Sequence, residues 1–364
     1  MARTADELAI GRAPGAAAAR RPRSRWGDDL VTVAAGTWLI IGLFVDGWAH
    51  NNLGQLETFF TPWHALLYSG FAACAGWLAW QVIRHQERGY PLARAVPVGY
   101  GLGVIGAAVF ALGGVSDGVW HTLLGIEVSI DALLSPPHLV MFTGATLVLT
   151  TPLRAAWSAP GPAAVGLRRF LPALLSLVLT TLLVAFFFQY WGAFSTVMWT
   201  PEGARWAAVD DVAFFVQSTG VAEVLVTNLI LLFPLLLATR RWRLPFGTAT
   251  VLFTAVAVGI SAMAAFEGAW LIVPAALGGA VADLLAARLR LGPSSPAATL
   301  RRWAVLVPVV LWSLFFATLA VTSGIGWPAT LWGGTVMFAA LTGLTLSLLA
   351  VPPVVGAGER PAAG

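Results

Sequence analysis

The sequence predicts an all-α protein, a polytopic transmembrane helical bundle of about ten spans. Hydrophobic residues make up 58% of the 364 residues and charged residues only 10%, and the mean hydropathy is +0.80. A soluble globular chain carries about 25% charged residues. The apolar runs reach roughly 20 residues, the length of a helix that crosses a bilayer. Backbone groups in lipid must bond within their own segment, so helices are the expected spanning form and the lipid bilayer is the first partner.

Ten apolar segments follow one another along the chain. The weakest boundary separates the seventh and eighth segments, where only Glu267-Gly268 interrupts the apolar run. A nine-span alternative, with that pair fused or folded re-entrantly, therefore stays open. The predicted spans are 30–49, 62–83, 96–116, 136–153, 170–190, 212–238, 246–266, 268–287, 303–322 and 328–350.

The arginines indicate how the helices are oriented. They gather at alternate ends of the predicted spans, and positive loops remain in the cytoplasm. Both termini are therefore expected in the cytoplasm of a protein of the plasma membrane. The net charge of +4 carries no sign of a nucleic-acid partner. The arginine clusters lie at 20–25, 84–94, 154–169, 240–243 and 288–302.

The predicted spans and tails suggest four regions. The start of the chain is rich in Ala, Arg and Pro, which favours disorder. The regions are a disordered cytoplasmic tail at 1–29, a duplicated metal-site unit at 30–154 (copies at about 30–95 and 96–154), C-terminal transmembrane helices at 155–350, and a flexible tail at 351–364.

Two stretches repeat one pattern of polar residues and hold four of the five histidines. The first reads Asp46-Gly47-Trp48-Ala49-His50, then a loop, then Thr61-Pro62-Trp63-His64. The second reads Asp117-Gly118-Val119-Trp120-His121, then a loop, then Ser135-Pro136-Pro137-His138. The Asp and first His positions are 71 residues apart between copies, and the second His positions 74. Two spans separate the copies, so the pattern predicts a parallel duplication with both copies facing outward.

Each copy has the chemistry of a metal site. An Asp and a His four residues apart share one face of a helix. Thr61 and Ser135 are good N-caps, each followed by Pro at the first helical position, so the second His falls in the first turn of the returning helix. The predicted ligand sets are Asp46, His50 and His64, and Asp117, His121 and His138. Imidazole with carboxylate suits copper(II), zinc or iron, and three protein ligands leave a position open for water or substrate. A pH-sensing cluster without metal is the alternative.

Two glutamates are further candidates for catalysis. Glu127, in the second outer loop, could serve as an acid or base beside the metal. Glu223 lies inside the sixth predicted span, where an ionisable side chain is costly and suggests function. It could relay protons, or it could be a protonated Glu bonded between helices.

Two other polar residues are expected to be structural. Asp283, near the cytoplasmic end of the eighth predicted span, is expected to pair with Arg288 or Arg290. The fifth histidine, His85, stands among charged residues and is expected to be solvated in a cytoplasmic loop.

The motif resembles a known family. Asp-x3-His, a loop, and Phe-Thr-Pro-x-His is similar to the metal-site segment of the C subunit of copper membrane monooxygenases, the methane and ammonia oxidisers. The second copy matches with a longer loop. The resemblance covers only the motif segments, and this chain has a second copy and extra C-terminal helices. The matching residues of the first copy are Asp46, His50, Phe60, Thr61, Pro62 and His64.

The resemblance implies a copper site at the outer part of the membrane, bound by one Asp and two His. It further implies oxygen-dependent oxidation of a small apolar substrate, in company with other membrane subunits. The leading prediction is therefore a copper-dependent, monooxygenase-like oxidoreductase. The open alternatives are a transporter of metal or a small molecule, a copper-handling protein, and a zinc-dependent membrane hydrolase.

Overall fold

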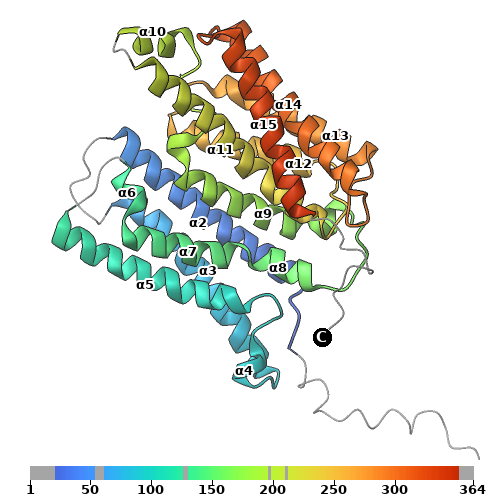
Figure 1. Ribbon diagram of the computed structural model, residues 1–364. Coiled ribbons are helices and arrows are strands. Elements are labelled where there is room, and N and C mark those ends of the chain that lie inside the picture. Colours follow the sequence, from blue (N-terminus) through green and yellow to red (C-terminus); the bar gives the residue numbers. More distant parts are fainter. Residues whose placement is uncertain (1–20, 54–60, 126–129, 196–197, 210–211, 352–364) are drawn as a thin grey trace, which may run out of the picture. The chain divides into compact units, whose positions relative to one another are not determined.

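The computed structural model describes residues 21–53, 61–125, 130–195, 198–209 and 212–351. Within these ranges the chain is nearly all helical and contains no β-strand (Figure 1). Residues 1–20 of the predicted N-terminal tail and 352–364 of the predicted C-terminal tail lie outside them. The helices are α2 (Trp26–Asn52), α3 (Pro62–Glu87), α4 (Leu92–Ala95), α5 (Gly101–Leu124), α6 (Asp131–Leu134), α7 (Pro136–Leu149), α8 (Thr151–Ser158), α9 (Leu167–Phe187), η2 (Gln189–Trp191), α10 (Pro201–Val209), α11 (Ala213–Thr239), α12 (Thr248–Met263), η3 (Ala269–Leu271), α13 (Ile272–Arg288), α14 (Ala297–Thr322) and α15 (Ala329–Ala350).

Nine helical segments among the described residues are long and apolar enough to cross a membrane, which makes the chain a multi-pass helical membrane protein. The seventh predicted span, 246–266, is shorter than expected. Its helix, α12, has 16 residues, or about 24 Å at 1.5 Å per residue, against a hydrocarbon core of about 30 Å. The chain leaves this helix at Ala264 and turns through Ala265, Phe266 and Gly268, which all have positive φ.

Two helices of the first half begin or end beyond their predicted bounds. α2 begins at Trp26, so residues 26–29 are helical and do not belong to a tail. Asp28 stabilises this start because its Oδ2 accepts a hydrogen bond from the Arg25 amide at 3.0 Å. α5 continues to Leu124, which places both Asp117 and His121 inside the helix.

The chain forms two compact units. The first consists of Met1–Pro160 with Leu171–Leu183, and the second of Gly161–Phe170 with Val184–Gly364. The middle of α9 therefore belongs to the first unit, together with α2, α3, α5 and α7. The sequence prediction had grouped this segment with the C-terminal helices at 155–350.

The first unit contains two closely packed helix pairs, α2 with α3 and α5 with α7 (Figure 1). Glycines permit the approach in both pairs. A Cβ atom at Gly42 would lie 2.6 Å from the Cα of Leu67, and one at Gly113 would lie 2.9 Å from the amide nitrogen of Met141. Small residues of this kind let transmembrane helices approach closely and gain van der Waals contact.

Polar side chains also tie the helices of the first unit together at the end remote from Asp46 along α2. Arg84 of α3 donates two hydrogen bonds to Asp28 of α2, at 3.1 and 2.9 Å. His85 belongs to this region and is only 3% exposed, with Nδ1 2.6 Å from the carbonyl oxygen of Gln81. The prediction of a solvated loop residue was wrong, because α3 continues to Glu87 and carries His85 on its packed face.

The second unit is also held by buried polar groups. Asn228 of α11 donates to the Ala339 carbonyl of α15 at 3.1 Å and accepts from Trp312 Nε1 of α14 at 3.1 Å. Asp283 of α13 accepts backbone hydrogen bonds from Gly247, Ala249 and Thr250, at 2.9 to 3.0 Å. These amides open α12, so Asp283 caps that helix and does not pair with Arg288 or Arg290.

Candidate metal centre

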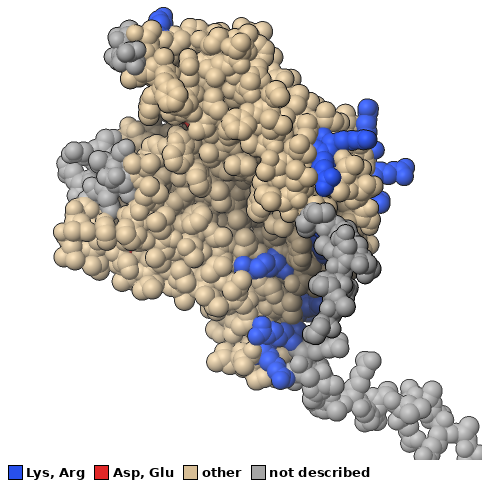
Figure 2. All heavy atoms as spheres, in the orientation of Figure 1, with Lys and Arg blue, Asp and Glu red and all other residues tan. Residues whose placement is uncertain are grey.

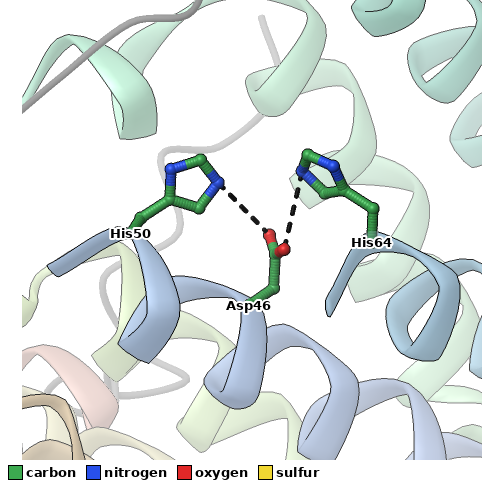
Figure 3. Close-up of side chains that lie close together, drawn as sticks. All are labelled: Asp46, His50 and His64. Atoms are coloured by element: carbon green, nitrogen blue, oxygen red, sulfur yellow. Dashed lines mark ion pairs between the residues drawn. The ribbon is translucent and has the colours of Figure 1, made fainter. Parts of the chain in front are cut away.

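The first predicted ligand set comes together where α2 ends and α3 begins (Figure 3). Asp46 and His50 lie one turn apart near the end of α2, with His50 Nε2 3.9 Å from Asp46 Oδ2. His64 points back from the first turn of α3, with Nε2 3.5 Å from Asp46 Oδ1. Thr61 accepts a hydrogen bond from the His64 amide at 3.1 Å, which confirms the predicted N-cap.

The second set has the same construction at the junction of α5 and α7. His121 Nε2 lies 3.3 Å and His138 Nε2 3.0 Å from the same oxygen, Oδ1 of Asp117. Ser135 occupies the N-cap position of α7, as predicted, but its side chain makes no capping hydrogen bond. Asp117 is 1% exposed, against 8% for Asp46.

The distances fit a metal ion in each set. Ligand atoms bound tetrahedrally at about 2.0 Å lie roughly 3.3 Å from one another. The nitrogen–oxygen distances of 3.0 to 3.9 Å bracket that value, and in each set the three ligand atoms all lie within 4.8 Å of one another.

A buried oxygen in each set also favours a cation. Oδ1 of Asp46 and Oδ1 of Asp117 are buried and accept no hydrogen bond from the part of the chain that the structure describes. This is the expected arrangement if carboxylate and imidazole lone pairs converge on a third species, and burying the carboxylate without compensation would be costly.

His121 shows which nitrogen is available. Its Nδ1 lies 3.2 Å from the carbonyl oxygen of Gly125. A carbonyl only accepts, so Nδ1 carries the proton and Nε2 faces Asp117 with either a lone pair or a second proton. A lone pair suits a metal ligand held by a backbone carbonyl, whereas a second proton would give the imidazolium of a pH-sensing cluster.

The two sets lie side by side in the first unit. The rings of His64 and His121 have centroids 6.5 Å apart. Tyr68, one turn after His64 on α3, donates a hydrogen bond from its hydroxyl to Oδ2 of Asp117 at 3.2 Å. A residue of the first helix pair thus contacts a predicted ligand of the second.

The sequence prediction did not include Tyr68. A signal for it was present, because Tyr68 is four residues after His64 and therefore shares its face of the helix. A hydrogen-bond donor on the same side of α3 as His64 is therefore a candidate that the sequence offers. What the sequence could not give was the neighbour across that face, which is the second helix pair.

The structure tests neither of the two catalytic candidates. Glu127, like the motif residue Phe60, lies outside the described residues. Glu223 belongs to the second unit, where it is 2% exposed in α11. Their roles remain predictions.

No protein-family model matches the chain, and no curated protein or solved structure matches it. The resemblance to the C subunit of copper membrane monooxygenases therefore depends on the motif residues alone.

Proposed function

We propose that the first unit binds two transition-metal ions, one in each Asp/His/His set, and that the protein is a metal-dependent membrane oxidoreductase. The observation that carries the proposal is the pair of adjacent three-residue sets, each with a buried aspartate oxygen facing two imidazoles. In a chain with 10% charged residues, so many ionisable groups at one place mark a functional site, and a bound cation would neutralise the two carboxylates.

Copper is the metal that we propose. Imidazole and carboxylate ligands, without thiolate, suit copper(II), and the motif resemblance adds the expectation of oxygen chemistry. Bound copper would supply one-electron redox chemistry toward oxygen. The chain itself would hold the ions through its six side chains, orient them through the helix ends, and admit a small apolar substrate from the lipid around it.

The proposed orientation places the metal sets on the outer side of the plasma membrane. On the face seen in Figure 2, the arginines of the first unit gather near the end where α4 lies, and none appears at the opposite end. The positive end is expected in the cytoplasm. Asp46 and His50 lie at the other end of α2, so they would face outward. Both chain termini would lie inside only if the short helix α12 is a tenth crossing, because nine crossings leave the termini on opposite sides.

We also propose that the two helix pairs arose by parallel duplication. The spacing that relates the ligands also relates the packing residues. Gly42 packs against Leu67, and Gly113 packs against Met141, at the same offsets of 71 and 74 positions. The same offsets relate the contact of Gly70 with Leu39 to that of Gly144 with Phe110.

Metal analysis of the purified protein tests the proposal. The parent, offered copper and purified without chelator, is expected to hold two ions per chain by mass spectrometry. His50→Ala should hold one, and His50→Ala combined with His121→Ala should hold none. His85→Ala is the matched control, because it removes a buried histidine outside both sets and should leave two.

The outcomes separate the candidate functions. Copper with oxygen consumption that His121→Ala abolishes would support the oxidoreductase. Zinc in place of copper would favour a hydrolase. A folded parent that takes up no metal when copper and zinc are offered would contradict the proposal and favour a proton-responsive cluster.

A further inference from the structure

We infer that Tyr68 is a positioning residue that makes the two metal sets chemically unequal. It holds the aspartate of the second set by a hydrogen bond for which the first set has no equivalent residue. The inference rests on the proposed metal function and goes beyond it, because it assigns the difference between the two sites to one hydroxyl group.

The orientation of the two carboxylates supports this assignment. In the second set both imidazoles face Oδ1 of Asp117, and the hydroxyl of Tyr68 binds the other oxygen, Oδ2. In the first set the two histidines face different oxygens of Asp46, His50 facing Oδ2 and His64 facing Oδ1. The phenol hydroxyl, which also lies 3.7 Å from Met141 Sδ, thus takes one lone pair of the oxygen that neither imidazole faces and orients the carboxylate.

The repeat-equivalent position cannot supply the same bond. The offset of 74 that relates His64 to His138 relates Tyr68 to Phe142. Phenylalanine has no hydroxyl to donate. The two halves of the centre therefore differ at the position whose side chain reaches across to the other set.

A second residue pair fits the same asymmetry. Gly114 leaves room for the Tyr68 ring, since a Cβ atom there would lie 2.8 Å from the ring carbon Cε1. The offset of 71 relates Gly114 to Leu43. The second helix pair has a glycine beside the Tyr68 ring where the first has a leucine, so the surroundings of the two repeat-equivalent rings differ as well.

The expected consequence is a tighter and more rigid second site. A donor that orients a ligating carboxylate typically changes metal affinity by about 10–100-fold. Asp117 should bind its ion through Oδ1 alone, whereas Asp46 keeps both oxygens available. The second set should therefore fill first, and its ion should have a different coordination.

Single-set proteins allow the two sites to be measured separately. His50→Ala with His64→Ala leaves only the second set, and His121→Ala with His138→Ala leaves only the first. In each background, Cu(II) affinity is measured by competition with a chelator, and the coordination by the hyperfine splitting of the Cu(II) electron paramagnetic resonance spectrum.

Two substitutions disrupt the hydrogen bond between Tyr68 and Asp117 in different ways. Tyr68→Phe removes the hydroxyl, and Gly114→Ala keeps it but displaces the ring. Each should weaken Cu(II) binding by the second set about 10-fold or more and alter its spectrum, while the first set is unchanged. Gly101→Ala is the control in the same helix, because a Cβ atom there meets nothing within 4 Å.

Three results would overturn the inference. If both sets bind Cu(II) and neither substitution affects the second, the metal function stands and the role of Tyr68 is wrong. If both sets weaken equally, Tyr68 serves only the fold. If neither set binds Cu(II) with Tyr68 in place, the proposed function fails and the inference fails with it.

Discussion

At the residue scale, the central feature is a pair of aspartates placed deep among apolar side chains. Asp117 is 1% and Asp46 8% exposed, and each lies within 4 Å of two histidines. A carboxylate in such a position must be neutralised by protons or by a cation. The two sets lie close together, with the rings of His64 and His121 6.5 Å apart, and this concentration of ligand-type side chains favours cations.

The backbone at the end of α5 also helps to orient a residue of the second set. Gly125 has φ of +88° and ψ of −179°, a conformation that is essentially restricted to glycine, and its carbonyl faces His121 Nδ1. Gly125→Ala should cost about 1–3 kcal/mol in strain or move that carbonyl. We expect weaker metal binding by the second set and no change in the first.

The metal affinity of each set in the Gly125→Ala protein checks this prediction. Gly76→Ala serves as control, because a Cβ atom there meets nothing within 4 Å. Unchanged affinity in the second set would show that the Gly125 carbonyl does not orient His121.

At the element scale, the geometry of each site depends on how closely two helices pack. Asp46 and His64 stand on different helices, and the distance between them follows from the approach of α2 to α3. Glycine contacts set that approach, since Gly70 meets the backbone of Leu39. The packing glycines therefore belong to the functional architecture although none of them is a ligand.

Gly70→Ala tests this dependence. The added Cβ atom would lie 2.6 Å from the backbone nitrogen of Leu39, so the helices must separate. Overpacking of this kind costs about 1–3 kcal/mol. The thermal midpoint should fall, and the first set should lose metal affinity more than the second. A stable protein with both affinities intact would separate helix packing from metal binding.

At the scale of the whole molecule, the sequence predicted much of the architecture. The all-helical class and nine of the ten predicted spans, the number of long apolar helices in the described ranges, follow from composition, since lipid permits few other forms for such a chain. The shortness of α12 could not be read from apolar runs, because Ala265 and Phe266 look like a continuation of the span. Only their positive φ values show the turn.

The candidate site, like the fold, was predictable only in part from the sequence. The convergence of the six Asp and His side chains was predictable, because local spacing, four residues along a helix and a few beyond a cap, places three of them together in each copy. Tyr68 and the burial of His85 were not predicted, because both depend on which helices pack together. The division into two units, with the middle of α9 in the first, likewise depends on contacts between distant segments.

The most direct test of the central claim is the electron paramagnetic resonance spectrum of the parent loaded with two Cu(II) ions per chain. It should be compared with the sum of the spectra of the two single-set proteins. Ions held side by side interact magnetically, so we expect the parent spectrum to be broader and weaker than that sum. A parent spectrum equal to the sum, or a parent that cannot be loaded with two ions, would contradict the account.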